Sequence, residues 1–150
     1  MKIKDVLHNK KSNKIFRINK DKTLCEAMEI FAHHRIRSLI VENDKEEVVG
    51  IITEKDVLRV CEKVHGNVKG RKVKDAMTPA DKMETINREE PIDKAMQIMT
   101  EKRVAHLPVF KDKVLVGIVS IGDLIKSLLD KSRKETKRLQ DYIAGKYPKE

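Results

Sequence analysis

The composition of this 150-residue chain suits one compact domain, or two small repeats that share a core. Apolar residues make up 39% of the chain but aromatic residues only 3%, and Trp is absent, so aliphatic side chains must build the core. No apolar run approaches the ~18 residues of a membrane span. The N-terminus lacks the apolar segment of a signal peptide. These features exclude an integral membrane protein and predict a soluble, cytoplasmic one.

The formal net charge of +9 at pH 7 comes from 33 basic and 24 acidic residues and favours an anionic partner. Nucleotides, nucleic acids and acidic protein surfaces all qualify, and charge alone does not choose among them. Part of the charge lies towards the ends of the chain, in Lys10-Lys11 and in residues 131–138. We interpret both stretches as solvated segments.

The first half of the chain predicts the element order β-α-β-β-α. Thr23 and Glu26 match a capping box at the start of a helix, in which each side chain satisfies a backbone N–H. Apolar runs at 38–41 and 48–52 then predict a pair of strands, and a closing helix begins near Glu54. The residues spaced like one apolar face of the first helix are Leu24, Ala27, Met28 and Phe31.

The same order recurs in the second half of the chain. Residues 48–59 and 115–126 share four identical positions of twelve, and six more keep their chemical type. The offset between matching residues is 67 there, 68 upstream and 70 at the start, where residues 2–7 match 72–77. The sequence therefore predicts an α/β (α+β) fold of two repeats, residues 1–62 and 71–130, joined by a linker at 63–70.

Residues 131–150 are predicted to be a C-terminal helical tail. A charge-rich helix is expected from Leu128 to Tyr147, with a weak apolar stripe that includes Leu129 and Ile143 and with Gly145 as its C-cap. Two interpretations of this tail remain open. It packs on a second subunit, or it is a solvated helix.

One motif recurs at the strand-to-helix junction of each repeat. It reads Gly-apolar-apolar-[Thr/Ser]-x-x-Asp and occurs as Gly50–Asp56 and as Gly117–Asp123. The N-terminus of a helix offers free backbone N–H groups and a partial positive charge to an anion. The hydroxyl can bind a phosphate, and the carboxylate can accept hydrogen bonds from the two hydroxyls of a ribose. The alternative is plain helix capping. Two copies at equivalent positions favour ligand binding.

The chain resembles a Bateman module, the tandem pair of cystathionine-β-synthase-type (CBS) repeats. The resemblance rests on the two motifs together with Lys74–Pro79 and Val104–Val109, and it covers roughly residues 1–62 and 70–130. It implies that the repeats pack with pseudo-twofold symmetry. The first repeat departs from the pattern, with Leu39-Ile40 where the second repeat has Leu107-Pro108.

The resemblance also implies a function. The module would be a non-catalytic sensor that binds AMP, ADP or ATP in the cleft between the repeats, needs no cofactor, and signals to an unidentified partner. Asp56 and Asp123 would bind the ribose, and Thr53 and Ser120 the phosphates. Members of this family usually pair, so a homodimer through the CBS faces and the C-terminal helix is expected. S-adenosylmethionine is the alternative ligand.

Further residues are implied around the base and the phosphates. Ile15 and Ile86, on the strands that enter each repeat, would flank the adenine. The backbone at Ser38 and His106 would contact it as well. The basic residues that could reach the phosphates are Arg37, Lys55 and His106.

Other chemistry finds little support in the sequence. No catalytic motif or metal-ligand spacing is present, and Cys25 and Cys61 are interpreted as small core residues in a reducing compartment. A basic nucleic-acid-binding protein is the alternative function. The scarcity of aromatic residues to stack on bases argues against it.

Overall fold

The structure is a computed structural model that describes residues 1–145, and it confirms a mixed α/β fold. The chain forms two compact units. Of the described residues, one unit contains 14–84, and the other contains 1–13 together with 85–145. The predicted order β-α-β-β-α is present in both units.

The unit of residues 14–84 contains a four-stranded sheet in the order β1-β2-β3-β4. β1 is parallel to β2, and the other neighbours are antiparallel. Its elements are β1 (Arg17–Asn19), α2 (Leu24–His34), β2 (Ser38–Glu42), β3 (Val48–Thr53), α3 (Glu54–Lys63), α4 (Val73–Ala76), β4 (Thr78–Pro79) and the short 3-10 helix η1 (Ala80–Lys82).

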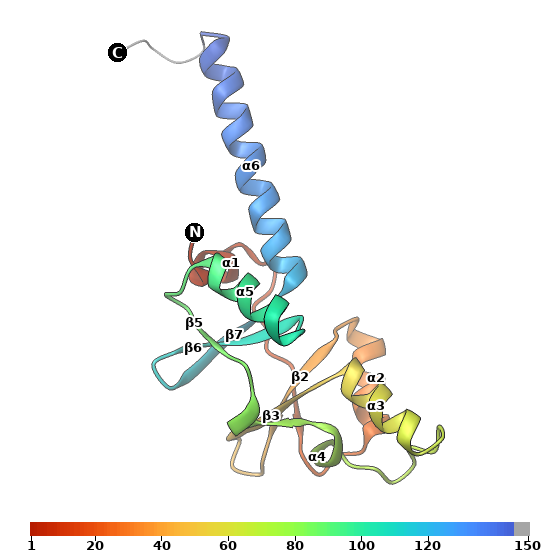
Figure 1. Ribbon diagram of the computed structural model, residues 1–150. Helices are drawn as coiled ribbons and strands as arrows, with labels where there is room; N and C mark the ends of the chain where they lie inside the picture. Colours follow the sequence, from red (N-terminus) through yellow and green to blue (C-terminus); the bar gives the residue numbers. More distant parts are fainter. Residues whose placement is uncertain (146–150) are drawn as a thin grey trace. The chain divides into compact units, whose positions relative to one another are not determined.

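The other unit repeats this plan with a three-stranded sheet in the order β5-β6-β7. Again the first pair of strands is parallel and the second antiparallel. Its elements are α1 (Ile3–Asn9), β5 (Ile86–Asn87), α5 (Ile92–Lys102), β6 (His106–Lys111), β7 (Val114–Ser120) and α6 (Ile121–Ile143) (Figure 1).

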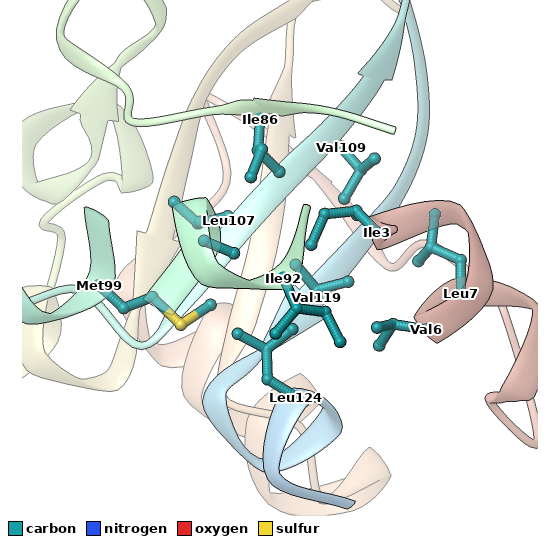
Figure 2. Packing of buried hydrophobic residues seen from close by; sticks show 11 residues of the cluster. Ile3, Val6, Leu7, Ile86, Ile92, Met99, Leu107, Val109, Val119 and Leu124 are labelled. Atoms are coloured by element: carbon teal, nitrogen blue, oxygen red, sulfur yellow. The ribbon is translucent and has the colours of Figure 1, made fainter. Parts of the chain in front are cut away.

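Each unit has its own core of aliphatic side chains, as the composition predicts. In the unit of β5–β7 the strands contribute Leu107 and Val119, α6 contributes Leu124, and α1 contributes Ile3 (Figure 2). All four side chains are fully buried. In the other unit, α2, β2 and β3 form an equivalent cluster around residues that include Leu39. Burial of this kind is the main favourable term in folding.

The first helix of each repeat packs on the unit that contains the other repeat. In α1, the backbone N–H groups of Ile3 and Lys4 donate to the carbonyl oxygens of Glu90 and Arg88, both over 2.9 Å. The short helix α4 is held in the same way before α2, because the N–H of Val73 donates to the Lys22 carbonyl over 2.8 Å. The compact units therefore differ from the predicted segments 1–62 and 71–130. α1 belongs to the unit that contains the sheet of the second repeat, and α4 belongs to the unit that contains the sheet of the first.

Lysine side chains strengthen the attachment of α1. The Nζ atoms of Lys4 and Lys2 lie 3.0 and 3.2 Å from Oε2 of Glu89, in the turn before α5. Their hydrogen bonds lower the pKa of Glu89 from 4.5 to about 2. In the other unit Lys74 and Asp21 form the corresponding pair, with Nζ and Oδ1 3.2 Å apart. The hydrogen bond from Lys74 lowers the pKa of Asp21.

We expect Glu89→Gln to lower the free energy of unfolding at neutral pH, and this loss to shrink in acid. The pKa of Glu89 is depressed in the folded state, so the ionised carboxylate stabilises the fold above its unfolded-state pKa of 4.5. That contribution is lost as the pH falls towards 2. Urea unfolding of both proteins at about pH 7 and about pH 2.5 measures the difference. A loss of equal size at both pH values would contradict a role for the charge.

Two sequence interpretations of helix α2 are wrong. Cys25 is exposed and therefore not a core residue, and Met28, expected on the apolar face, is exposed by 36%. The buried face of α2 is formed by Leu24, Ala27 and Phe31, at spacings of three and four. Cys25 follows Leu24 directly and so points about 100° away from it around the helix.

The predicted C-terminal helix is present but is not a separate element. α6 continues unbroken from Ile121 to Ile143, across the expected boundary at residue 131. Gly145 has a φ of 72°, as expected where the helix ends, whereas Tyr147 lies outside the described residues. From residue 131 to 140 every residue of α6 is exposed. None of the helices within residues 1–145 has both the length and the apolar character to cross a membrane.

Candidate functional site: two strand-to-helix corners

The two copies of the glycine-to-aspartate motif form equivalent corners, one in each unit. In the first corner β3 ends at Thr53 and α3 begins at Glu54, and in the second β7 ends at Ser120 and α6 begins at Ile121. The start of the neighbouring strand lies beside each corner, because Ser38 pairs with Thr53 and His106 with Ser120. The sheet register therefore brings together residues about 15 positions apart in the sequence.

In the first corner, Asp56 is largely occupied by its own helix. Its Oδ2 accepts hydrogen bonds from the backbone N–H of Thr53 over 2.9 Å and from the Thr53 hydroxyl over 3.1 Å. Its Oδ1 lies 3.3 Å from Nη1 of Arg59, one turn further along α3. Asp56 is buried, with an exposed fraction of 7%. This geometry shows that the capping role weighed from the sequence is real at this corner.

In the second corner, Asp123 has the same capping contact but is more open. Its Oδ2 accepts from the backbone N–H of Ser120 over 2.8 Å, and the Ser120 hydroxyl accepts from the N–H of Asp123 over 3.1 Å. The Asp123 side chain is 23% exposed, against 8% for Asp56. Of the two carboxylates, Asp123 is thus the more accessible to a ligand.

Lys10 is a site residue that the sequence reasoning missed. Its Nζ lies 3.0 Å from Oδ2 of Asp123 and donates to the carbonyl oxygen of Ile118 over 2.8 Å. The interpretation of Lys10-Lys11 as a solvated segment is therefore wrong for Lys10. No local pattern could have revealed this contact, because 113 positions separate Lys10 from Asp123 in the sequence. The packing of α1 in the unit of β5–β7 brings them together.

A cavity of about 280 Å³ opens beside Asp123. It lies entirely within the unit of β5–β7 and is lined by the end of α1 and the first turns of α6. Its lining residues are Asn9, Lys10, Lys11, Ser12, Asp123, Lys126, Ser127 and Asp130. The mixture of ammonium groups and hydroxyls suits an anion that also carries hydrogen-bonding groups.

The glycine of each motif allows the other repeat's first helix, or the residues after it, to approach the strand closely. A Cβ atom added at Gly50 would lie 2.5 Å from the carbonyl oxygen of Thr78. One added at Gly117 would lie 2.8 Å from Cδ2 of Leu7. Both distances are too short for a real contact, so each glycine has a packing role as well as its place in the motif.

The remaining predicted residues lie in three kinds of environment. Arg37 and Lys55 are exposed next to the first corner, and the Arg37 carbonyl accepts a hydrogen bond from the N–H of Glu54 over 3.4 Å. His106 is half-buried at the start of β6. Ile15 is half-buried but precedes β1, so its predicted position on a strand is wrong. Ile86 does lie on β5, although its side chain is in the core with 4% exposed.

Ile15 and Ile86 are also not equivalent in the two units. Ile86 pairs with Val109 across β5 and β6. The residue that pairs in the same way with Val41 of β2 is Ile18, not Ile15.

Within residues 1–145 no three His, Cys, Asp or Glu side chains converge in a way that could hold a metal ion.

The comparisons with known proteins agree on the family. A family model described as the CBS domain matches residues 3–63 and again 73–130. The mitochondrial CBS domain-containing protein CBSX3 of Arabidopsis thaliana is 38% identical over 129 residues. That match covers 85% of this chain and 63% of the plant protein, so the chain spans less than two thirds of this relative's length.

Solved structures share the fold. A protein with CBS domains from Burkholderia ambifaria MC40-6 has a TM-score of 0.80 and 30% identity, over 87% of this chain and 95% of that one. CBSX2 in complex with AMP is 21% identical, with a TM-score of 0.69 over 87% and 98% of the chains. The CBS domain pair of MJ0100, in complex with 5′-methylthioadenosine and S-adenosyl-L-methionine, is 24% identical, with a TM-score of 0.72 over 87% and 98%.

Proposed function

The chain belongs to the CBS-domain family as a tandem pair of these domains, and on this premise we propose that it is a non-catalytic regulatory module for AMP, ADP or ATP. The observation that carries the proposal is the corner at Asp123. There the carboxylate of Asp123, three lysine side chains and the serines Ser12 and Ser127 line one cavity beside the first turns of α6. Adenosine ligands bound by CBSX2 and by MJ0100 support this ligand class.

The groups at this corner match the parts of a nucleotide. One oxygen of Asp123 is used by the Ser120 N–H, and the carboxylate has lone pairs for further donors such as ribose hydroxyls. At the start of α6 the N–H groups of Ile121 and Asp123 are bonded to the Ala105 carbonyl and the Ser120 hydroxyl, so the helix attracts a phosphate through its partial positive charge. The lysines beside it attract the same group. The buried, Arg59-bound Asp56 makes the first corner the weaker candidate.

Regulation would follow from differential binding. A ligand shifts a conformational equilibrium only as far as its affinities for the two states differ. We propose that an unidentified partner protein binds preferentially to the conformation that the nucleotide favours.

The cytoplasmic location stays a prediction from the sequence.

The test of the proposed function compares two capping aspartates. We expect Asp123→Ala to weaken AMP or ATP binding on the order of 10- to 100-fold, since hydrogen bonds to a charged acceptor are lost. In α1, Oδ2 of Asp5 accepts from the Lys2 N–H over 2.8 Å, so Asp5 caps its helix as Asp123 does. Asp5→Ala should therefore cost a similar stability of roughly 0.3–1 kcal/mol and leave affinity unchanged. Isothermal titration and urea unfolding measure both quantities.

Three outcomes would count against the proposal. Absence of heat from the unsubstituted protein with AMP, ATP and S-adenosylmethionine at millimolar concentration would refute it. Equal effects of Asp123→Ala and Asp5→Ala on affinity would reduce Asp123 to a cap. Binding of labelled RNA or duplex DNA that weakens steeply with salt would favour the nucleic-acid alternative instead.

We further propose a homodimer in which α6 and the CBS faces contact a second copy. Large apolar side chains remain exposed along α6, among them Ile125, Leu129 and Leu139 with exposed fractions of 47%, 51% and 61%. A second subunit would cover such residues. Sedimentation equilibrium should give twice the monomer mass of 17.3 kDa, and Leu129→Glu should lower it. A single monomeric species at all concentrations would contradict this assembly.

A further inference from the structure

Lys10 reaches the corner at Asp123 from outside the motif and occupies the carboxylate that the ligand would need. Its ammonium group is held on two sides, 3.0 Å from Oδ2 of Asp123 and 2.8 Å from the carbonyl oxygen of Ile118. Its side chain is only 26% exposed. At the first corner, by contrast, the cation near Asp56 comes from the same helix, and the Arg59 side chain is 71% exposed. Of these two cations, Lys10 is thus the more buried and the one that comes from outside the motif.

The charges around the cavity leave a place for an anion once Lys10 is released. The lining carries three lysines, Lys10, Lys11 and Lys126, against the two carboxylates of Asp123 and Asp130. With a volume of about 280 Å³, the cavity is slightly smaller than the roughly 300–1,000 Å³ of pockets that enclose whole ligands. It fits the sugar-phosphate end of a nucleotide better than the entire molecule.

We propose that Lys10 is an exchangeable counter-ion that makes the Asp123 corner selective for phosphorylated adenosine ligands. In the free protein it neutralises Asp123. When a nucleotide binds, the ribose hydroxyls take over the Asp123 carboxylate and the Lys10 ammonium moves to the phosphate. Each group of the original ion pair keeps a hydrogen-bonding partner, so neither charged group is left without one. This inference rests on the proposed function and deepens it by naming the residue that selects for the phosphate.

A ligand without a phosphate gives no such exchange. Adenosine and 5′-methylthioadenosine would displace Lys10 from Asp123 without offering the ammonium an anion. S-adenosylmethionine adds a sulfonium and an ammonium group, which lysines repel at short range. Its single carboxylate lies in the same amino acid moiety as that ammonium. The lysine-rich lining therefore favours AMP, ADP or ATP over all three.

The experiment measures the ratio of AMP affinity to adenosine affinity by isothermal titration on the full chain. Lys10→Met removes the charge and keeps most of the side-chain length. It should weaken AMP binding and strengthen adenosine binding, so that the ratio falls about tenfold or more. Lys10→Arg retains the charge and should keep most of the ratio. Lys134→Met is the matched control, because Lys134 is an exposed lysine of α6 that does not line the cavity, and it should change the ratio by less than about threefold.

The outcomes separate this inference from the function on which it rests. An unsubstituted protein that binds neither AMP nor adenosine would overturn the proposed function, and the inference with it. AMP binding with an unchanged ratio in Lys10→Met would overturn the inference alone. Equal losses in Lys10→Met and Lys134→Met would do the same, because they would indicate general attraction by a basic surface. Circular dichroism of each variant checks that the fold is intact.

Discussion

Replacing Ile3 by Ala is expected to lower the free energy of unfolding by about 2–5 kcal/mol. Ile3 is fully buried, and its side chain packs with Leu107, Val119 and Leu124 in the core of the second repeat (Figure 2). The loss of apolar contacts and the cavity left behind both contribute. Urea unfolding measures the total effect, and hydrogen exchange locates it.

The segments whose hydrogen exchange becomes faster show whether α1 packs on the sheet of the second repeat or on that of its own repeat. Faster hydrogen exchange is expected in β5–β7 and α5, far along the sequence from the substitution. Val73→Ala is the matched control, since Val73 is also fully buried but belongs to the core that contains Leu39. It should loosen β1–β3 and α2 instead. Loosening of β1–β3 by Ile3→Ala would contradict the observed arrangement of α1.

Gly50→Ala is expected to cost stability in the upper part of the roughly 1–3 kcal/mol typical of overpacking. The new Cβ would lie 2.5 Å from the Thr78 carbonyl oxygen and 2.9 Å from the Met77 sulfur. Thr78 belongs to β4, which pairs with β3 at this point, so the backbone itself would have to shift. The clash involves neither Thr53 nor Asp56, the polar residues of the corner.

Gly117→Ala is the control and should cost less. The atoms nearest to its new Cβ would be Cδ2 and Cδ1 of the Leu7 side chain, at 2.8 and 3.2 Å, and the end of a side chain shifts more easily than backbone. Urea unfolding of the two variants gives the comparison directly. An equal or larger loss for Gly117→Ala would show that the backbone contact at Thr78 is not what distinguishes the two glycines.

The two corners show how far the motif predicts the site. The spacing from hydroxyl to aspartate correctly indicated a strand end, a helix start and a carboxylate in the first turn. It also indicated the capping contact, which both corners form. It could not indicate which cations approach the carboxylates. Arg59 lies three residues after Asp56 and is detectable from helical spacing, whereas Lys10 has no such relation to Asp123.

The family, the duplication, the order of the elements and the aliphatic core are all legible in the amino-acid sequence, because these depend on periodicity and on local backbone preference. The unit that each leading helix joins becomes known only from the folded chain. That choice depends on backbone hydrogen bonds such as Ile3 to Glu90 and on burial of Ile3, which no local pattern encodes. The same packing brought Lys10 to Asp123 and so made the second corner different from the first.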